Sequence, residues 1–115
     1  MKNRYDRFLT DKERKGLQLF SHQLRQLLGD ELQEIELFGS KVRGDSDQES
    51  DIDILIIVKS KDWRIHEEIC GLAADINLDY DCNISPVIYS QEEYGKNRYF
   101  RTLFIQYIER EGIPL

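Results

Sequence analysis

The sequence predicts an α/β domain, in which a small mixed β-sheet carries helices packed on it. Amphipathic helical segments alternate with short strand-like runs, and one of these runs is apolar on both faces, as in a central strand. The expected order is α, β, short α, β, α, β, α. At 115 residues the chain has room for one core, so we expect a single domain over residues 1–115.

The first half of the chain contains clear boundary signals. Thr10 and Glu13 form a capping box at the start of a long helix, and Gly29-Asp30 ends it. The apolar face of this helix consists of Leu17, Phe20, Leu24, Leu27 and Leu28. Residues 34–38 alternate as a strand that runs into a tight turn at Gly39. A short helix over residues 40–44 and a polar loop over 45–50 should follow.

The second half predicts two more strands and two more helices. Residues 52–58 are dense in β-branched side chains, and residues 62–77 have helical spacing. Residues 82–89 form a third strand, and Pro86 places this strand at an edge or a bulge. One last helix is expected over residues 96–111. The apolar stripe assigned to its core face is Phe100, Leu103, Phe104, Tyr107 and Ile108.

Charge and hydropathy exclude several classes of protein. The net charge of −6 argues against extensive contact with nucleic acid, which requires a basic surface. No apolar run approaches the roughly 18 residues that span a bilayer, so no membrane association is expected. The polar N-terminus is no secretory signal, and a cytoplasmic protein is the default expectation.

Two short motifs carry the chemistry. Gly39-Ser40 at the end of a strand allows close approach of the backbone to an anion, although taken alone such a turn is common. Asp51 and Asp53 alternate along the next strand, so both carboxylates point to the same side. Two neighbouring carboxylates repel each other, and a bound cation such as Mg²⁺, which prefers oxygen ligands, relieves the repulsion.

Together these motifs resemble a known signature. Gly39-Ser40, ten intervening residues and then Asp51-Ile52-Asp53 resemble the pattern of the DNA polymerase β-type nucleotidyltransferase superfamily. The fuller string GSKVRGDSDQESDIDILI resembles its minimal nucleotidyltransferases, often encoded beside a helical HEPN-domain partner. The resemblance implies a palm-like nucleotidyltransferase fold for residues 1–115.

The resemblance also implies roles for individual residues. Gly39 and Ser40 would bind the β- and γ-phosphates of ATP or another nucleoside triphosphate, with Arg43 as a nearby charge partner. Asp51 and Asp53 would be the catalytic residues and would coordinate Mg²⁺. The implied reaction is in-line attack of an acceptor hydroxyl on the α-phosphorus, which releases pyrophosphate. In the minimal group this implies an antitoxin that neutralises its partner, in some cases by transferring AMP to a partner tyrosine.

One departure from the family pattern bears on activity. Active members place a third carboxylate on the next core strand, where this chain has Ser85 in the corresponding position. Asp79 or Asp81 would serve only if that strand started earlier or bent. A catalytically impaired nucleotide-binding module that neutralises or regulates a partner by binding therefore stands as the alternative function, and transfer to a small molecule is a third.

The length of the chain bears on the identity of the acceptor. Larger relatives carry a helical domain that holds the nucleobase and the acceptor, and 115 residues leave no room for one. Another chain is therefore expected to complete the pocket, or the acceptor is itself a protein.

Overall fold

In the part of the chain that the structure describes, four strands form one mixed sheet in the order β3-β2-β1-β4. The computed structural model describes residues 9–43 and 51–115. The strands are β1 (Leu32–Phe38), β2 (Ile52–Val58), β3 (Ile84–Ser90) and β4 (Ile113–Pro114). β1 runs antiparallel to both β2 and β4, whereas β2 and β3 are parallel. The predicted mixed sheet is confirmed, and the central strand is predicted to the residue.

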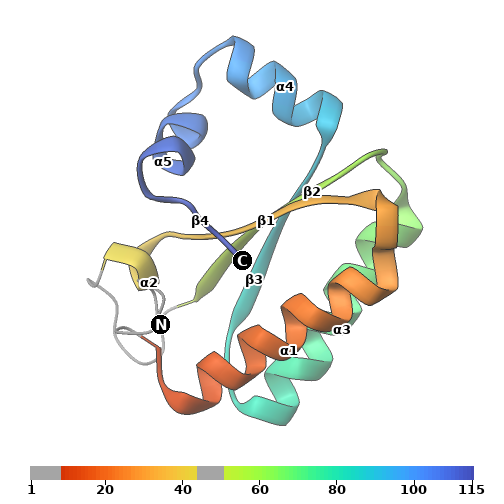
Figure 1. Ribbon diagram of the computed structural model, residues 1–115, viewed down its shortest axis with the longest axis vertical. Coiled ribbons are helices and arrows are strands. Elements are labelled where there is room, and N and C mark those ends of the chain that lie inside the picture. The colour runs from red at the N-terminus through yellow and green to blue at the C-terminus, as the bar shows by residue number, and fades with distance from the viewer. Residues whose placement is uncertain (1–8, 44–50) are drawn as a thin grey trace.

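The helices cover both faces of this sheet (Figure 1). Helices α1 (Asp11–Leu28) and α3 (Trp63–Tyr80) pack on one face, and α4 (Gln91–Tyr99) and α5 (Leu103–Glu111) lie on the other. The short helix α2 (Ser40–Arg43) follows β1, and a 3-10 turn over Gly29–Glu31 connects α1 to β1. No helix among the described residues is long and apolar enough to cross a bilayer.

Alternation along β2 divides its side chains between two cores. Ile52, Ile54, Ile56 and Val58 belong to the large cluster under α1 and α3. Leu55 and Ile57 face the other way and pack with Ile108 of α5 in a smaller cluster. Asp53 shares the face of Leu55 and Ile57, so it lies on the less covered side of the sheet, beside α5.

Several boundary predictions are confirmed. The capping box is present at the start of α1, where the Thr10 hydroxyl accepts from Glu13 N at 3.1 Å. Pro86 lies in β3, which is an edge strand, as its missing N–H requires. The predicted end of the short helix at Gly44 and the loop over 45–50 lie outside the described residues.

The prediction of one last helix is wrong. The backbone turns at Arg101, whose φ is +50°, and Thr102 caps a new helix, its hydroxyl accepting from Ile105 N at 3.3 Å. The predicted stripe continued across this break, so part of it faces outward: Phe100 is 71% exposed and Leu103 is 74% exposed. The two-residue strand β4 was also missed, because its pairing with β1 is long-range.

Candidate functional site

The turn after β1 depends on glycine. Gly39 has a φ of +86°, a conformation that side-chain-bearing residues rarely adopt. Its carbonyl accepts from Val42 N at 3.1 Å and from Arg43 N at 3.2 Å, which closes α2. Ser40 is the first residue of this helix. The predicted strand–turn–helix arrangement is therefore present.

A buried ion pair that sequence reasoning missed anchors the turn to α1. Lys41 Nζ lies 2.9 Å from Glu13 Oε2, and both side chains are at most 5% exposed. Glu13 Oε1 also accepts from Thr10 N at 2.8 Å, so one carboxylate serves both the helix cap and the lysine. The capping box identified Glu13, but no sequence signal placed Lys41 inside the protein.

Asp53 lies directly against the Gly39 turn. In the register of the sheet, Asp53 pairs with Phe38 of β1 and with Ser85 of β3. A Cβ atom at Gly39 would lie only 2.3 Å from Asp53 Oδ2, a distance that real Cβ atoms do not show. The glycine thus allows the carboxylate to approach the backbone, and the structure brings together two parts of the predicted motif.

The electrostatics of Asp53 are those of a crowded carboxylate. Burial raises its pKa, the neighbouring charge of Asp51 raises it further, and the charge of Arg43 partly offsets both. Asp51 is exposed and stands immediately before β2. Two neighbouring carboxylates are oxygen donors suited to a hard divalent cation.

Arg43 connects the turn to α5. Its Nη1 lies 2.9 Å from Glu111 Oε1, and the Glu111 side chain is 11% exposed. Since its charge also acts on Asp53, Arg43 lies where an anion beside the two aspartates would meet a positive charge. The structure therefore brings Gly39, Arg43 and Asp53 together. Ser40 begins the short helix that ends at Arg43, and Asp51 lies two residues before Asp53 in the sequence.

No third carboxylate completes the aspartate pair in the described part of the chain. Ser85 occupies the register position beside Asp53. Asp79 lies in the last turn of α3, and Asp81 is its C-cap with a left-handed backbone. Within residues 9–43 and 51–115, no three His, Cys, Asp or Glu side chains are arranged to hold a metal ion.

A cavity of about 570 Å³ opens beside these residues. One side consists of the Gly39 turn and Asp53, and the other side belongs to α5. The lining residues are Phe38, Gly39, Arg43, Asp53, Phe104, Tyr107, Arg110 and Glu111. Sequence reasoning assigned Phe104 and Tyr107 to the core and gave Arg110 no role, because it could not orient α5.

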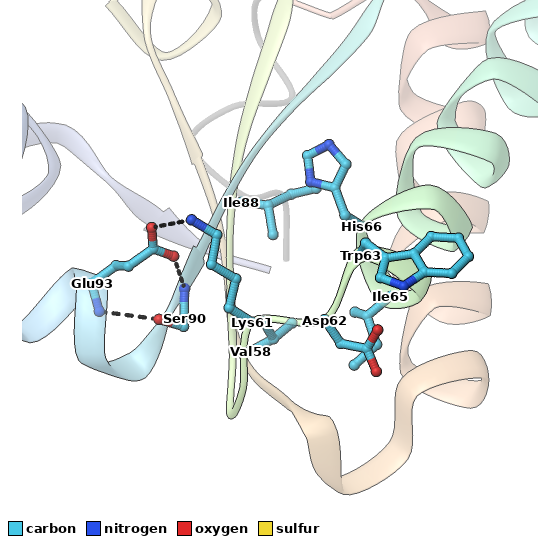
Figure 2. A pocket seen from close by; sticks show the side chains of 9 residues that line it. All are labelled: Val58, Lys61, Asp62, Trp63, Ile65, His66, Ile88, Ser90 and Glu93. Atoms are coloured by element: carbon cyan, nitrogen blue, oxygen red, sulfur yellow. Dashed lines mark hydrogen bonds and ion pairs between the residues drawn. The ribbon is translucent and has the colours of Figure 1, made fainter.

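A second cavity, of about 390 Å³, lies at the far end of β2 and β3 between the starts of α3 and α4 (Figure 2). At about 3.3 Å per strand residue, it is roughly 16 Å from Asp53. Three of its polar residues bond to one another, since Glu93 accepts from Lys61 Nζ at 3.1 Å and from Ser90 N at 3.0 Å. It contains none of the predicted site residues.

Comparison with known proteins identifies the class. The sequence model of the nucleotidyltransferase domain matches residues 17–111, which include Gly39, Ser40, Arg43, Asp51 and Asp53. The chain therefore belongs to the nucleotidyltransferase domain family, and it is a nucleotidyltransferase.

Curated relatives are similar over most of the chain. A Methanocaldococcus jannaschii protein named "Putative protein adenylyltransferase" is 37% identical over 97 residues, covering 84% of this chain and 91% of its own length. A second protein of the same name and organism is 34% identical and covers 73% of this chain and 80% of its own length.

Solved structures of toxin–antitoxin complexes share the fold. A toxin–antitoxin crystallised with AMP-PNP superimposes with a TM-score of 0.55 at 25% identity, covering 84% of this chain and 69% of that one. The MntA–HepT toxin–antitoxin gives a TM-score of 0.50 at 23% identity over the same shares of the two chains, a likeness of fold alone.

Proposed function

We propose that the chain is a Mg²⁺-dependent nucleotidyltransferase that transfers a nucleoside monophosphate, AMP from ATP, to a hydroxyl of a partner protein. The observation that carries this proposal is the contact between Asp53 and the Gly39 turn, with Asp51 beside it. A turn with one carboxylate against it and a second carboxylate nearby suits a metal–triphosphate complex.

Each site residue has a role in this proposal. Gly39 and Ser40 bind the β- and γ-phosphates, and Arg43, held by Glu111, adds a positive charge beside them. Asp51 and Asp53 would hold Mg²⁺, and the ion would neutralise part of the negative charge of the triphosphate. The chain's own contribution is to orient the α-phosphorus for in-line attack, since catalysis of phosphoryl chemistry is largely positioning and electrostatics.

The proposed partner is a protein that binds an exposed apolar surface of this chain. Three large hydrophobic side chains stand exposed where α4 meets α5: Tyr99 is 82% exposed, Phe100 71% and Leu103 74%. Clustered exposed apolar residues are typical of protein interaction sites. The fold shared with toxin–antitoxin complexes supports an antitoxin role for this chain. From the resemblance of its motif to the minimal nucleotidyltransferases, we propose further that it acts in the cytoplasm and that its partner is a helical HEPN-type toxin.

Transfer of label from ATP tests the proposal. Purified protein, its cognate helical partner, Mg²⁺ and α-labelled ATP should give labelled partner, and the double variant Asp51→Ala/Asp53→Ala should give none. Far-UV circular dichroism of the variant checks that it is folded. If the wild-type protein transfers no label under varied metals and nucleotides, transferase activity toward this partner is excluded.

The second candidate is a module that regulates its partner by binding nucleotide without turnover. Ser85 beside Asp53 favours it, because a neutral hydroxyl is a weak Mg²⁺ ligand and a poor base. Under this candidate, neutralisation of the partner survives Asp53→Asn. Replacing the serine discriminates between the two: Ser85→Asp should raise the transfer rate at least tenfold if the third carboxylate limits turnover, and Ser85→Asn controls for side-chain size.

A further inference from the structure

The cavity beside Asp53 has an aromatic wall that belongs to α5. Phe104 is fixed at the base of this wall, with its ring centroid 5.5 Å from that of Phe38 and 5.4 Å from that of Tyr89. Tyr107 lies one helical turn further on and is 46% exposed, so it lines the cavity while its ring remains accessible. The wall thus has a packed aromatic base and a partly exposed ring above it.

Charged contacts tie this wall to the Gly39 turn. Glu111 of α5 holds Arg43 at 2.9 Å, which connects α5 directly to the end of α2. On the same helix, Arg110 Cζ lies 5.2 Å from the centroid of the Tyr107 ring. The cavity is therefore continuous from the turn and Asp53 to an aromatic ring with a guanidinium over it.

We propose that Tyr107 is the stacking platform for the base of a purine nucleoside triphosphate, with Arg110 beside it. This inference rests on the proposed function, which places the triphosphate at Gly39 and Asp53. Aromatic rings stack on any base, and the larger purine ring system gains more contact than a pyrimidine. The volume of about 570 Å³ is within the usual range for small-molecule sites.

The proposed base site is built from elements of the described chain alone. In this chain α5 follows α4 and lies against the sheet, where Ile108 packs on Leu55 and Ile57 of β2. The base would therefore be bound within the same chain, and a partner protein would supply only the acceptor.

Binding measurements separate the base from the phosphates. Calorimetry with Mg-ATP and with Mg-tripolyphosphate, which lacks the base and sugar, is performed on wild type, Tyr107→Ala and Tyr107→Phe. Stacking on an aromatic ring is worth about 1–3 kcal/mol, so Tyr107→Ala should weaken Mg-ATP binding roughly 5- to 150-fold. Binding of Mg-tripolyphosphate should stay within about twofold of wild type, and Tyr107→Phe should retain ATP affinity.

The control is Trp63→Ala, which truncates an exposed aromatic residue of the second cavity and should leave Mg-ATP affinity unchanged. Thermal melts verify the fold of each variant. An unchanged ATP affinity in Tyr107→Ala, an equal loss for both ligands, or a loss in Trp63→Ala would overturn the inference and leave the proposed function standing. Failure of the wild type to bind either ligand, or binding that Asp53→Asn does not weaken, would overturn the proposed function itself.

Discussion

Gly39 and Asp53 are 14 positions apart in the sequence and in contact in the structure. The contact follows from antiparallel pairing of β1 with β2, which places Asp53 opposite Phe38 and so beside the next residue, Gly39. Glycine is required there for two separate reasons, a positive φ and the space taken by the carboxylate. A matched pair of substitutions can separate the two.

We expect Gly39→Ala to abolish Mg-ATP binding, because the new Cβ would displace the Asp53 carboxylate. Gly29→Ala is the control, since Gly29 also has a positive φ, +52°, but no neighbouring atom lies within 4 Å of the position that its Cβ would take. Both substitutions should lower the free energy of unfolding by about 1–3 kcal/mol through backbone strain. Calorimetry and urea unfolding measure the two effects, and intact nucleotide binding by Gly39→Ala would contradict the role of the contact.

The buried pair Lys41–Glu13 should be worth far more to stability than a surface pair. Lys41→Met leaves the Glu13 carboxylate buried without its cation, which should cost about 3–5 kcal/mol in urea unfolding. Lys61→Met breaks the exposed pair with Glu93, whose lysine is 79% exposed, and should cost about 1 kcal/mol or less. Equal costs would show that the α2 turn does not depend on its anchor to α1.

Strand β1 carries a second pair of close carboxylates, on the face that α4 and α5 cover. Burial, followed by a hydrogen bond with Glu34 and repulsion from Glu34, raises the pKa of Glu36 to about 7 in total. Burial and the same two glutamates raise the pKa of Tyr94, which belongs to α4. The surroundings therefore favour the protonated form of the Glu36 carboxyl, and its ionisation destabilises the fold.

The pKa of Glu36 predicts how stability changes with pH. Since its pKa is higher in the folded than in the unfolded protein, its contribution to stability is complete below about pH 4.5 and is lost as the pH rises through about 7. Thermal melts should show Tm falling across this window, and Glu36→Gln should reduce the slope. Glu67→Gln, at an exposed position of α3, should leave the slope unchanged.

The whole molecule covers the two faces of its sheet unequally. Two helices of 18 residues each pack on one face, whereas two helices of nine residues each lie on the other. The shorter pair leaves room for the cavity beside Asp53 and turns apolar side chains outward at the corner between α4 and α5. The candidate site and the exposed apolar corner therefore occupy the same side of the protein.

We expect this corner to contribute to partner binding independently of nucleotide. The double variant Phe100→Ser/Leu103→Ser should weaken the complex with the cognate helical partner at least tenfold, while Mg-ATP affinity and Tm stay near wild type. Leu78→Ser is the control, because Leu78 is 83% exposed but lies on α3, across the sheet. Biolayer interferometry measures the affinity of the complex. An equal loss of affinity in Leu78→Ser would show that the corner between α4 and α5 is not the specific binding surface.

Some predictions failed because their signals were not local. The break at Arg101 interrupts a continuous apolar stripe, and only the packing of α5 shows which part of the stripe is buried. Burial of Lys41 depends on Glu13, which lies 28 positions earlier on another helix. The α5 wall of the cavity was missed for the same reason, since helical spacing does not reveal which face meets the sheet.

Local sequence was sufficient for the family, the capping box, the extent of β2 and the turn at Gly39, because each depends on residues within one short segment of the chain. The register of the strands set what lies beside Asp53: Gly39 in contact, Ser85 in place of an acid, and α5 as the opposite wall. These neighbours come from distant parts of the chain, and only the packing of the sheet and helices brings them together.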